Sequence, residues 1–250
     1  MTPFDVSYLG KVLKGDHLAG SSTLQTLLIH GAGSSERGRF APLRCALQQR
    51  GIGSSAFDCI GHGQTGGSLR ESSLASRTHQ AEAVVDAQFR AQCSPWPLAL
   101  IGVSMGAYNA IRLLETRRVD ALVLVVPGVY TPAAYELAFG AGFSAVIRKP
   151  LSWDETDAWA ILGQFTGRLL VIAAEHDAVI PPEIPERLVE AAGQAAWRQQ
   201  LVELLTGQRF GRIELLLAGQ RSGLGRRALQ DLGEPAVQPQ AVVDGRAHER

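Results

Sequence analysis

The residues WPLALIGVSMG, numbered 96–106, carry the most specific structural signal in this chain. Trp96–Val103 is an apolar run typical of a buried strand, and Met105–Arg117 has the apolar spacing of a helix. The strand turns into the helix at Ser104, inside a pentapeptide of the form G-x-S-x-G. A strained turn of this kind exposes the serine hydroxyl above the sheet, so Ser104 is a candidate nucleophile. The plainer alternative is a serine that caps the helix.

Apolar runs alternate with amphipathic stretches along the first nine-tenths of the chain. This alternation predicts the α/β class, with a mostly parallel sheet flanked by helices. The last strand is either Leu201–Leu205 or Ile213–Ala218. The other predicted strands are Leu24–His30, Gly53–Ile60, Trp96–Val103, Asp120–Val126 and Arg168–Ala174, and the predicted helices are Phe40–Arg50, Thr78–Gln92 and Met105–Arg117.

We expect a single domain over residues 1–232 and a loose tail over residues 233–250. Residues 127–167 are rich in aromatic side chains and form a longer link than a plain strand–helix–strand unit needs. They form either a small cap over the carboxyl ends of the strands or two ordinary core-packing helices. The sequence leaves both interpretations open.

The composition excludes several classes of protein. The 250 residues include 24 basic and 24 acidic side chains, a balance that argues against a nucleic-acid binder or a basic membrane-surface protein. No run approaches the roughly 18 apolar residues of a membrane span, and the first residues lack the apolar core of a secretion signal. Cys45, Cys59 and Cys93 have no metal-ligand spacing, so we expect ordinary thiols, a cytoplasmic location and no metal site.

A second glycine-rich turn, His30-Gly31-Ala32-Gly33, follows the first predicted strand. Such a turn can bring a backbone N–H close to the N–H that follows the nucleophile, and together the two form an oxyanion hole. We therefore expect the N–H groups of Ala32 and Met105 to bind the oxyanion. His30 is expected to orient this loop rather than to carry a proton.

Residues 61–66, Gly-His-Gly-Gln-Thr-Gly, match the dinucleotide-binding pattern G-x-G-x-x-G. The residues that follow are polar and lack the apolar stripe of a helix that packs on the sheet. No acidic residue ends a strand at the expected distance. We expect neither a nucleotide nor any other cofactor here.

Asp177 lies just beyond the fifth predicted strand. An acid in this position can orient a histidine whose other ring nitrogen faces the serine. The alternative is a turn aspartate that precedes Pro181. His176 is a poor candidate for the base, because its side chain should point away from that of its neighbour Asp177.

Four motifs in this order resemble those of the α/β-hydrolase superfamily, most closely its small esterase, lipase and peptidase-like members. The resemblance covers about Leu24 to Pro182 and implies Ser104 as nucleophile, Asp177 as triad acid and the N–H groups of Ala32 and Met105 as oxyanion hole. It also implies that Asp58–Gly63 is a structural turn. The motifs are His30–Gly33, Asp58 with Gly61-His62-Gly63, Gly102–Gly106, and Glu175–Asp177 with Ile180-Pro181.

The superfamily has a histidine after its last strand, and the two segments that could follow that strand here contain none. The only histidine beyond Asp177 is His248. Three explanations stay open: a folded tail brings His248 to the site; the base is lost or supplied by His62 or His79; or the segment from about Trp197, rich in Arg, Gln and Gly, is not the family's native C-terminus.

These observations predict a serine hydrolase that cleaves a small or medium carboxylic ester or thioester through an acyl-enzyme. Its partner would be a small molecule with a hydrophobic acyl or alcohol group. An acyltransferase on the same triad would differ only in its acceptor. The alternative class is a catalytically impaired hydrolase fold that binds a ligand or a protein.

Overall fold

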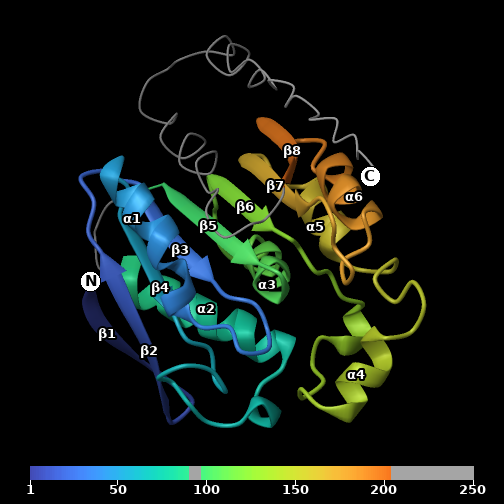
Figure 1. Ribbon diagram of the computed structural model, residues 1–250, viewed down its shortest axis with the longest axis horizontal. Coiled ribbons are helices and arrows are strands. Elements are labelled where there is room, and N and C mark those ends of the chain that lie inside the picture. The colour runs from blue at the N-terminus through green and yellow to red at the C-terminus, as the bar shows by residue number, and fades with distance from the viewer. Residues whose placement is uncertain (90–96, 204–250) are drawn as a thin grey trace, which may run out of the picture. The chain divides into compact units, whose positions relative to one another are not determined.

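The computed structural model describes residues 1–89 and 97–203, which form an eight-stranded sheet flanked by helices (Figure 1). The strand order is β1-β2-β4-β3-β5-β6-β7-β8, in which β4, β3 and β5–β8 are parallel and β1 and β2 are antiparallel. The predicted α/β class with a mostly parallel sheet is confirmed. The strands are β1 Thr2–Tyr8, β2 Lys11–Leu18, β3 Gln25–Ile29, β4 Ser54–Phe57, β5 Leu98–Val103, β6 Ala121–Val125, β7 Arg168–Ala174 and β8 Trp197–Glu203.

Two hydrophobic cores lie on the two faces of this sheet. Successive side chains of a strand point to opposite faces, so Leu100 enters one core and Ile101 enters the other. Helices α2, α3, α5 and α6 cover the first face and α1 covers the second. The helices are α1 Ala41–Gln49, α2 Leu74–Phe89, α3 Met105–Leu113, α4 Ala141–Ile147, α5 Ala158–Gly163 and α6 Glu183–Ala191, with short 3-10 turns at Arg37–Phe40, Leu69–Glu71 and Pro132–Ala134.

Helix α2 begins at Leu74, four residues before its predicted start at Thr78. In this additional turn Leu74 and Ala75 are buried, so the core-facing side of the helix already begins at Leu74. Arg77 and Gln80 are fully buried. Helix α1 ends as predicted before Gly51, whose positive φ of 75° suits a glycine at a helix C-terminus.

The antiparallel hairpin of β1 and β2 was not among the predicted elements. Most side chains of β1 are exposed, so the strand carries little apolar signal. Its turn consists of Leu9 and Gly10, with φ values of 44° and 77°. Leu13 is buried in the core, which anchors the hairpin to the sheet edge.

Residues 127–167 contain α4 and α5, which occupy different places. In Figure 1, α4 lies beyond the carboxyl ends of the strands, whereas α5 lies beside α6. Phe143 of α4 packs against Phe139 and Tyr130, with ring centroids 4.9 and 5.9 Å apart. Helix α5 contacts α3 and α6 and contributes to the first core. Thus α4 lies beyond the strand ends and places Phe143 in the first core, whereas α5 is a core-packing helix.

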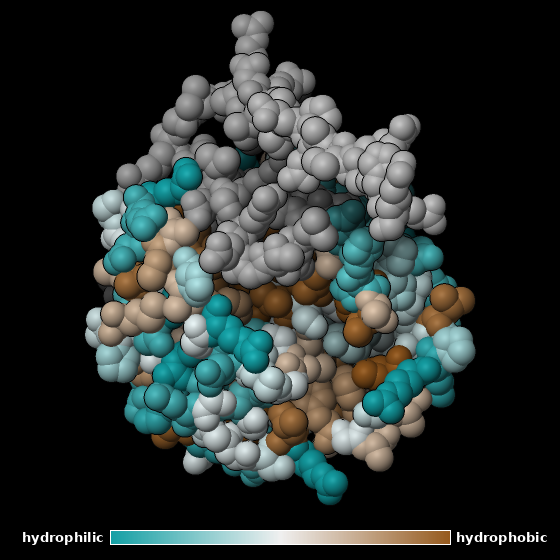
Figure 2. Space-filling view, viewed as in Figure 1, coloured by the Kyte–Doolittle hydropathy of each residue, from teal (hydrophilic) through white to brown (hydrophobic). Residues whose placement is uncertain are grey.

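The described part of the surface mixes hydrophilic and hydrophobic residues on the face that Figure 2 shows. Within the described ranges, no helix is both long and apolar enough to span a bilayer. Strand β8 includes the start of the first candidate for the last strand, Leu201–Leu205. The second candidate Ile213–Ala218, the predicted tail 233–250, Cys93 and His248 lie outside the described residues.

Candidate active site

Ser104 lies between the end of β5 and the start of α3, in the turn that the sequence predicts. Its backbone has φ 52° and ψ −118°, a conformation that costs a non-glycine residue about 1–3 kcal/mol. The Ser104 N–H donates to the carbonyl oxygen of Val125 at 2.9 Å, and the Gly128 N–H donates to that of Ser104 at 3.2 Å. Its side chain makes no capping hydrogen bond to α3. The hydroxyl is therefore not used as a helix cap.

The two glycines of the pentapeptide are required by close backbone packing. A Cβ on Gly102 would lie 2.5 Å from the Cα of Ala107, and one on Gly106 would lie 2.6 Å from the carbonyl oxygen of His30. Both distances are too short for any side chain. The helix that follows Ser104 thus packs directly against the end of β3.

The His30–Gly33 loop lies against Ser104. A Cβ on Gly31 would lie 3.1 Å from the Cβ of Ser104 and 3.7 Å from its Oγ. Neither the Ala32 N–H nor the Met105 N–H donates a hydrogen bond in the described part of the chain. Both amide groups remain able to bind an oxyanion at this end of the sheet.

His30 is fully buried and its two ring nitrogens are both occupied. Nδ1 lies 2.7 Å from the carbonyl oxygen of Gly31, and Nε2 accepts from the Cys59 N–H at 3.0 Å. A carbonyl can only accept and an amide N–H can only donate, so the ring is neutral with its proton on Nδ1. Burial, followed by the nearby charge of Arg77, lowers the pKa of His30 to about 2. His30 therefore orients the loop and carries no exchangeable catalytic proton.

The Asp58–Gly63 turn is organised around the buried carboxylate of Asp58. This carboxylate forms an ion pair with Arg37 and accepts from the Arg37 N–H at 2.8 Å and the Gln64 N–H at 2.9 Å. A Cβ on Gly63 would lie 2.7 Å from Asp58 Oδ1, which explains the glycine there. The glycines of this turn thus make room for a carboxylate of the chain itself.

His62 of the same turn is buried beside His30, with ring centroids 4.7 Å apart. Its Nδ1 lies 3.3 Å from the carbonyl oxygen of Ile60, and its Nε2 has no partner in the described part of the chain. Burial is the main cause that lowers the pKa of His62. His62 follows β4, which in the strand order is one strand farther from β5 than β3, the strand that His30 follows. His79, on α2, is exposed.

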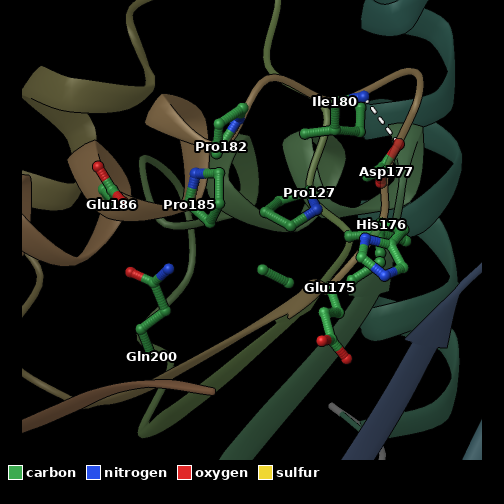
Figure 3. Close-up of a pocket in the computed structure, with 12 residues that line it drawn as sticks. Pro127, Glu175, His176, Asp177, Ile180, Pro182, Pro185, Glu186 and Gln200 are labelled. Atoms are coloured by element: carbon green, nitrogen blue, oxygen red, sulfur yellow. Dashed lines mark hydrogen bonds between the residues drawn. The ribbon is translucent and has the colours of Figure 1, made fainter. Parts of the chain in front are cut away.

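Asp177 follows the end of β7, which is separated from β5 only by β6. Neighbouring strands lie about 4.8 Å apart, so the two strand ends are about 10 Å apart. A serine and an aspartate side chain, with one histidine ring hydrogen-bonded between them, can span such a gap. Asp177 Oδ1 accepts from the N–H groups of Val179 and Ile180 at 2.8 and 2.9 Å, as Figure 3 shows for Ile180. Its Oδ2 has no described partner. One carboxylate oxygen is thus fixed by the turn and the other remains available.

A cavity of about 360 Å³ opens beside Asp177, between the end of β7 and α6 (Figure 3). Val126 and Pro127, which follow β6, form part of its wall, and Gln200 of β8 closes another side. Glu175 and His176 also line the cavity and both are exposed. His176 makes no described hydrogen bond to Asp177, as expected for its immediate neighbour in sequence.

Within the described ranges, no histidine forms a hydrogen bond with Ser104 or Asp177. The structure therefore brings Ser104 next to the Ala32 loop and places Asp177 on the same edge of the sheet. His248 lies outside the described residues.

Arg77 was missed by the sequence analysis. It belongs to α2 and donates to the carbonyl oxygens of His30 and Gly31 from inside the protein. The available signal was its spacing from Leu74 and Ala81, which places it on the apolar face once the helix begins at Leu74.

The sequence matches one protein-family model and two related proteins. A family model described as serine aminopeptidase, S33, matches residues 22–153, just over half of the 250 residues. Two proteins of Mycobacterium tuberculosis, from strains CDC 1551 and H37Rv and both named as uncharacterized, are each 30% identical to the chain over 178 residues. These matches cover 71% of this chain and 61% of each relative.

Solved structures show the same architecture. An esterase of Pyrococcus furiosus superposes with a TM-score of 0.62 and 18% identity, covering 88% of both chains. A thioesterase domain from the curacin biosynthetic pathway has a TM-score of 0.61 and 14% identity, covering 88% of this chain and 98% of that domain. At these identities the likeness is one of fold.

Proposed function

Because the chain belongs to the serine aminopeptidase S33 family of α/β hydrolases, we propose that it is a serine hydrolase that cleaves a small or medium carboxylic ester or thioester. The observation that carries this proposal is the backbone of Ser104, which holds an uncapped hydroxyl in a strained turn beside a glycine loop. A structural serine would gain nothing from this strain. The esterase and thioesterase with the same fold support the choice of substrate class.

In the proposed first half-reaction, Ser104 Oγ attacks the carbonyl carbon of the substrate. A histidine takes the hydroxyl proton, and Asp177 Oδ2 orients and stabilises that histidine. The resulting oxyanion accepts hydrogen bonds from the N–H groups of Ala32 and Met105. The intermediate then collapses to an acyl-serine, and the alcohol or thiol leaves with the proton from the histidine.

In the second half-reaction the same histidine takes a proton from water, and the hydroxide oxygen attacks the acyl carbon. Collapse of the second tetrahedral intermediate releases the carboxylic acid and returns the proton to Ser104. We propose His248 as this histidine, because the sequence contains no other beyond Asp177. No step requires a metal ion or an organic cofactor.

We propose that α4 and the residues before it form a cap over the acyl-binding side of the site. The Phe143 ring contacts both Tyr130 and Phe139, with ring centroids 5.9 and 4.9 Å apart. Tyr130 also packs edge-on against Tyr108 of α3 at 5.4 Å, which connects this aromatic cluster to the helix after Ser104. Such a wall favours a hydrophobic acyl or alcohol group.

A cytoplasmic location is also proposed, from the cysteines. Cys45 and Cys59 are free thiols, and Cys59 is completely buried, where burial raises its pKa. Thiols that are not paired in disulfides are typical of a reducing compartment. Cell fractionation, with antibodies against an appended tag, would locate the protein.

Labelling with a fluorophosphonate probe tests the proposed function. The wild type should label, Ser104→Ala should not, and both should unfold at the same temperature within error. Hydrolysis of p-nitrophenyl acetate and butyrate, an acyl thioester and an aminoacyl p-nitroanilide then separates esterase, thioesterase and peptidase activity. A folded wild type that neither labels nor hydrolyses any of these would instead indicate a binding protein.

The nature of the acceptor is tested separately. Added alcohols or amines compete with water for the acyl-serine, and the ratio of transfer to hydrolysis products distinguishes an acyltransferase from a hydrolase. We expect hydrolysis to dominate at millimolar acceptor. Transfer that exceeds hydrolysis under those conditions would assign the protein to the acyltransferases.

A further inference from the structure

Arg77 is a fully buried arginine whose position calls for an explanation. A buried charge is unfavourable unless it is paired or hydrogen-bonded, and arginines are rarely buried without a carboxylate. In the described part of the chain Arg77 has no ion pair, and its Nη1 has no hydrogen-bond partner at all. Arg44, the other fully buried arginine in these ranges, is paired with Asp16.

The contacts that Arg77 does make lead to the loop beside Ser104. Its Nη2 donates to the carbonyl oxygen of His30 and, at 3.3 Å, to that of Gly31. Its Nε donates to Asn109 Oδ1 of α3 at 3.2 Å. The guanidinium therefore joins α2, the helix after Ser104 and the His30–Gly33 loop.

Asn109 is in turn fixed by α2. Its amide group donates to the carbonyl oxygen of Leu74 and to Thr78 Oγ1, each at 3.0 Å. The Arg77 side chain thus has little freedom, because Asn109, which accepts from its Nε, is itself fixed by two hydrogen bonds of its amide nitrogen. A rigid donor of this kind can define where the loop carbonyls lie.

The Gly31 carbonyl and the Ala32 N–H belong to the same peptide unit. Because all described peptide bonds are trans, they point in opposite directions. Arg77 and His30 both approach the Gly31 oxygen, which turns the carbonyl toward α2 and the Ala32 N–H away from it. A donor on the carbonyl also polarises the peptide and makes its N–H a stronger donor.

We infer that Arg77 is a positioning residue, which holds the Gly31–Ala32 peptide and strengthens the Ala32 N–H as an oxyanion donor. The inference rests on the proposed function, since it assumes that Ala32 binds the oxyanion formed at Ser104. The guanidinium acts through the peptide and does not touch the substrate. Its positive charge, not neutralised by a carboxylate of the described chain, additionally favours negative charge at this end of the sheet.

Two substitutions at Arg77 test this inference. Arg77→Lys keeps the charge and the apolar part of the side chain. Its ammonium group cannot donate to both loop carbonyls and to Asn109 at once, as the planar guanidinium does. Arg77→Met removes both the charge and the donors. We expect kcat to fall by about 10-fold in the first and about 100-fold in the second, with KM within about threefold, since outright loss of one oxyanion donor costs about 100- to 1000-fold.

The affinity for an alkyl trifluoromethyl ketone gives a second measurement. This compound forms a tetrahedral adduct with the serine, so its binding depends on the oxyanion hole. Its Kd should rise by the same factor by which kcat/KM falls. A purely structural role of Arg77 would lower the unfolding temperature without this correlation.

Arg44→Lys is the matched control, because Arg44 is equally buried but bonds to Asp16 and Ser54 near the β1–β2 hairpin. It should lower the unfolding temperature and leave kcat and the ketone affinity unchanged. Folded Arg77 variants with wild-type kcat and ketone affinity would overturn the inference while the proposed function stands. Absence of Ser104 labelling in the wild type would overturn both.

Discussion

Gly106, in the first turn of α3, lies so close to His30 at the end of β3 that a Cβ on Gly106 would be 2.6 Å from the His30 carbonyl oxygen. The same oxygen accepts a hydrogen bond from Arg77. The helix that carries Ser104 at its start is therefore in direct backbone contact with the strand that carries the Ala32 loop. The distance between Ser104 and the Ala32 loop is therefore set by backbone packing and not by flexible side chains.

Gly106→Ala should be strongly destabilising, because neither backbone can move without disrupting the sheet. We expect a loss of more than about 3 kcal/mol in the free energy of unfolding, within the range of severe overpacking. Urea denaturation measures it. Gly142→Ala in α4 is the control: nothing lies within 4 Å of its added Cβ, so it should be neutral or stabilising by up to about 1 kcal/mol.

The proposed triad predicts that His248→Ala and Asp177→Asn each lower kcat by about 10³- to 10⁴-fold with little change in KM. Because the triad acts as a unit, the double variant should be no worse than the poorer single variant. Steady-state hydrolysis of p-nitrophenyl butyrate gives kcat and KM for the two single variants and the double variant. His17→Ala, on the distant β2, should retain full activity. Unchanged activity in His248→Ala would exclude this base, and loss in His62→Ala or His79→Ala would identify another.

Stability should fall as pH decreases below about 6.5, because His30 stays neutral in the folded protein while the unfolded chain takes up a proton. Burial is the main cause that lowers the pKa of His30 to about 2, and the charge of Arg77 adds to it. Burial also lowers the pKa of His62 and of His17. The contribution of a buried neutral histidine to the free energy of unfolding is complete above a pH of about 6.5, the pKa of histidine in the unfolded chain. It is lost as the pH falls from there toward the pKa of the same ring in the folded protein. Each such histidine contributes a slope approaching about 1.4 kcal/mol per pH unit.

Urea denaturation between pH 7 and pH 4.5 checks this dependence. His30→Gln, which cannot titrate, should show a shallower decrease than the wild type. His79→Gln, at an exposed position of α2, is the control and should follow the wild-type curve. Parallel curves for wild type and His30→Gln would contradict the assignment of a neutral buried ring.

The buried hydroxyl of Tyr108 donates to Asp157 Oδ1 at 2.7 Å and connects α3 to α5. Arg112 donates to the other oxygen of the same carboxylate at 2.7 Å. Tyr108→Phe should lower the free energy of unfolding by about 1–3 kcal/mol, because it leaves Asp157 without one of its partners. Tyr8→Phe, on the N-terminal edge strand β1, is the control and should change stability by less than about 0.5 kcal/mol. Equal effects of the two substitutions would mean that this contact does not stabilise the fold.

The turn of the N-terminal hairpin offers a stabilising substitution. Leu9 is 86% exposed and has a φ of 44°, a region that asparagine adopts more readily than leucine. Leu9→Asn should raise the free energy of unfolding by about 1 kcal/mol, because it relieves part of the strain of a leucine in this region. Gly10→Ala should act in the opposite direction by a similar amount, since Gly10 has a φ of 77°. Thermal unfolding should show a higher unfolding temperature for Leu9→Asn and a lower one for Gly10→Ala than for the wild type.

The mostly parallel sheet and the order of the motifs along it follow from local patterns in the sequence. Strands β5, β6 and β7 read as predominantly apolar runs, and a glycine-rich turn follows β3, so these signals are local and need no knowledge of the fold. The buried strand β4 is an exception, because it begins with Ser54 and Ser55. The predicted β7 matches the structure from Arg168 to Ala174. The turn at Ser104 was likewise recognisable, because the strand, the serine and the helix are adjacent in sequence.

Other features depend on tertiary packing and leave no local pattern. The β1–β2 hairpin is stabilised at a sheet edge and carries little apolar pattern, so periodicity does not reveal it. Arg77 looks like a surface residue in the sequence, and only the packing of α2 against α3 and the His30 loop buries it. The protonation of His30 depends on Gly31 and Cys59, which meet it on two sides. Local patterns determine which elements form, whereas the side chains that act on the site are brought there by contacts between residues far apart in the chain.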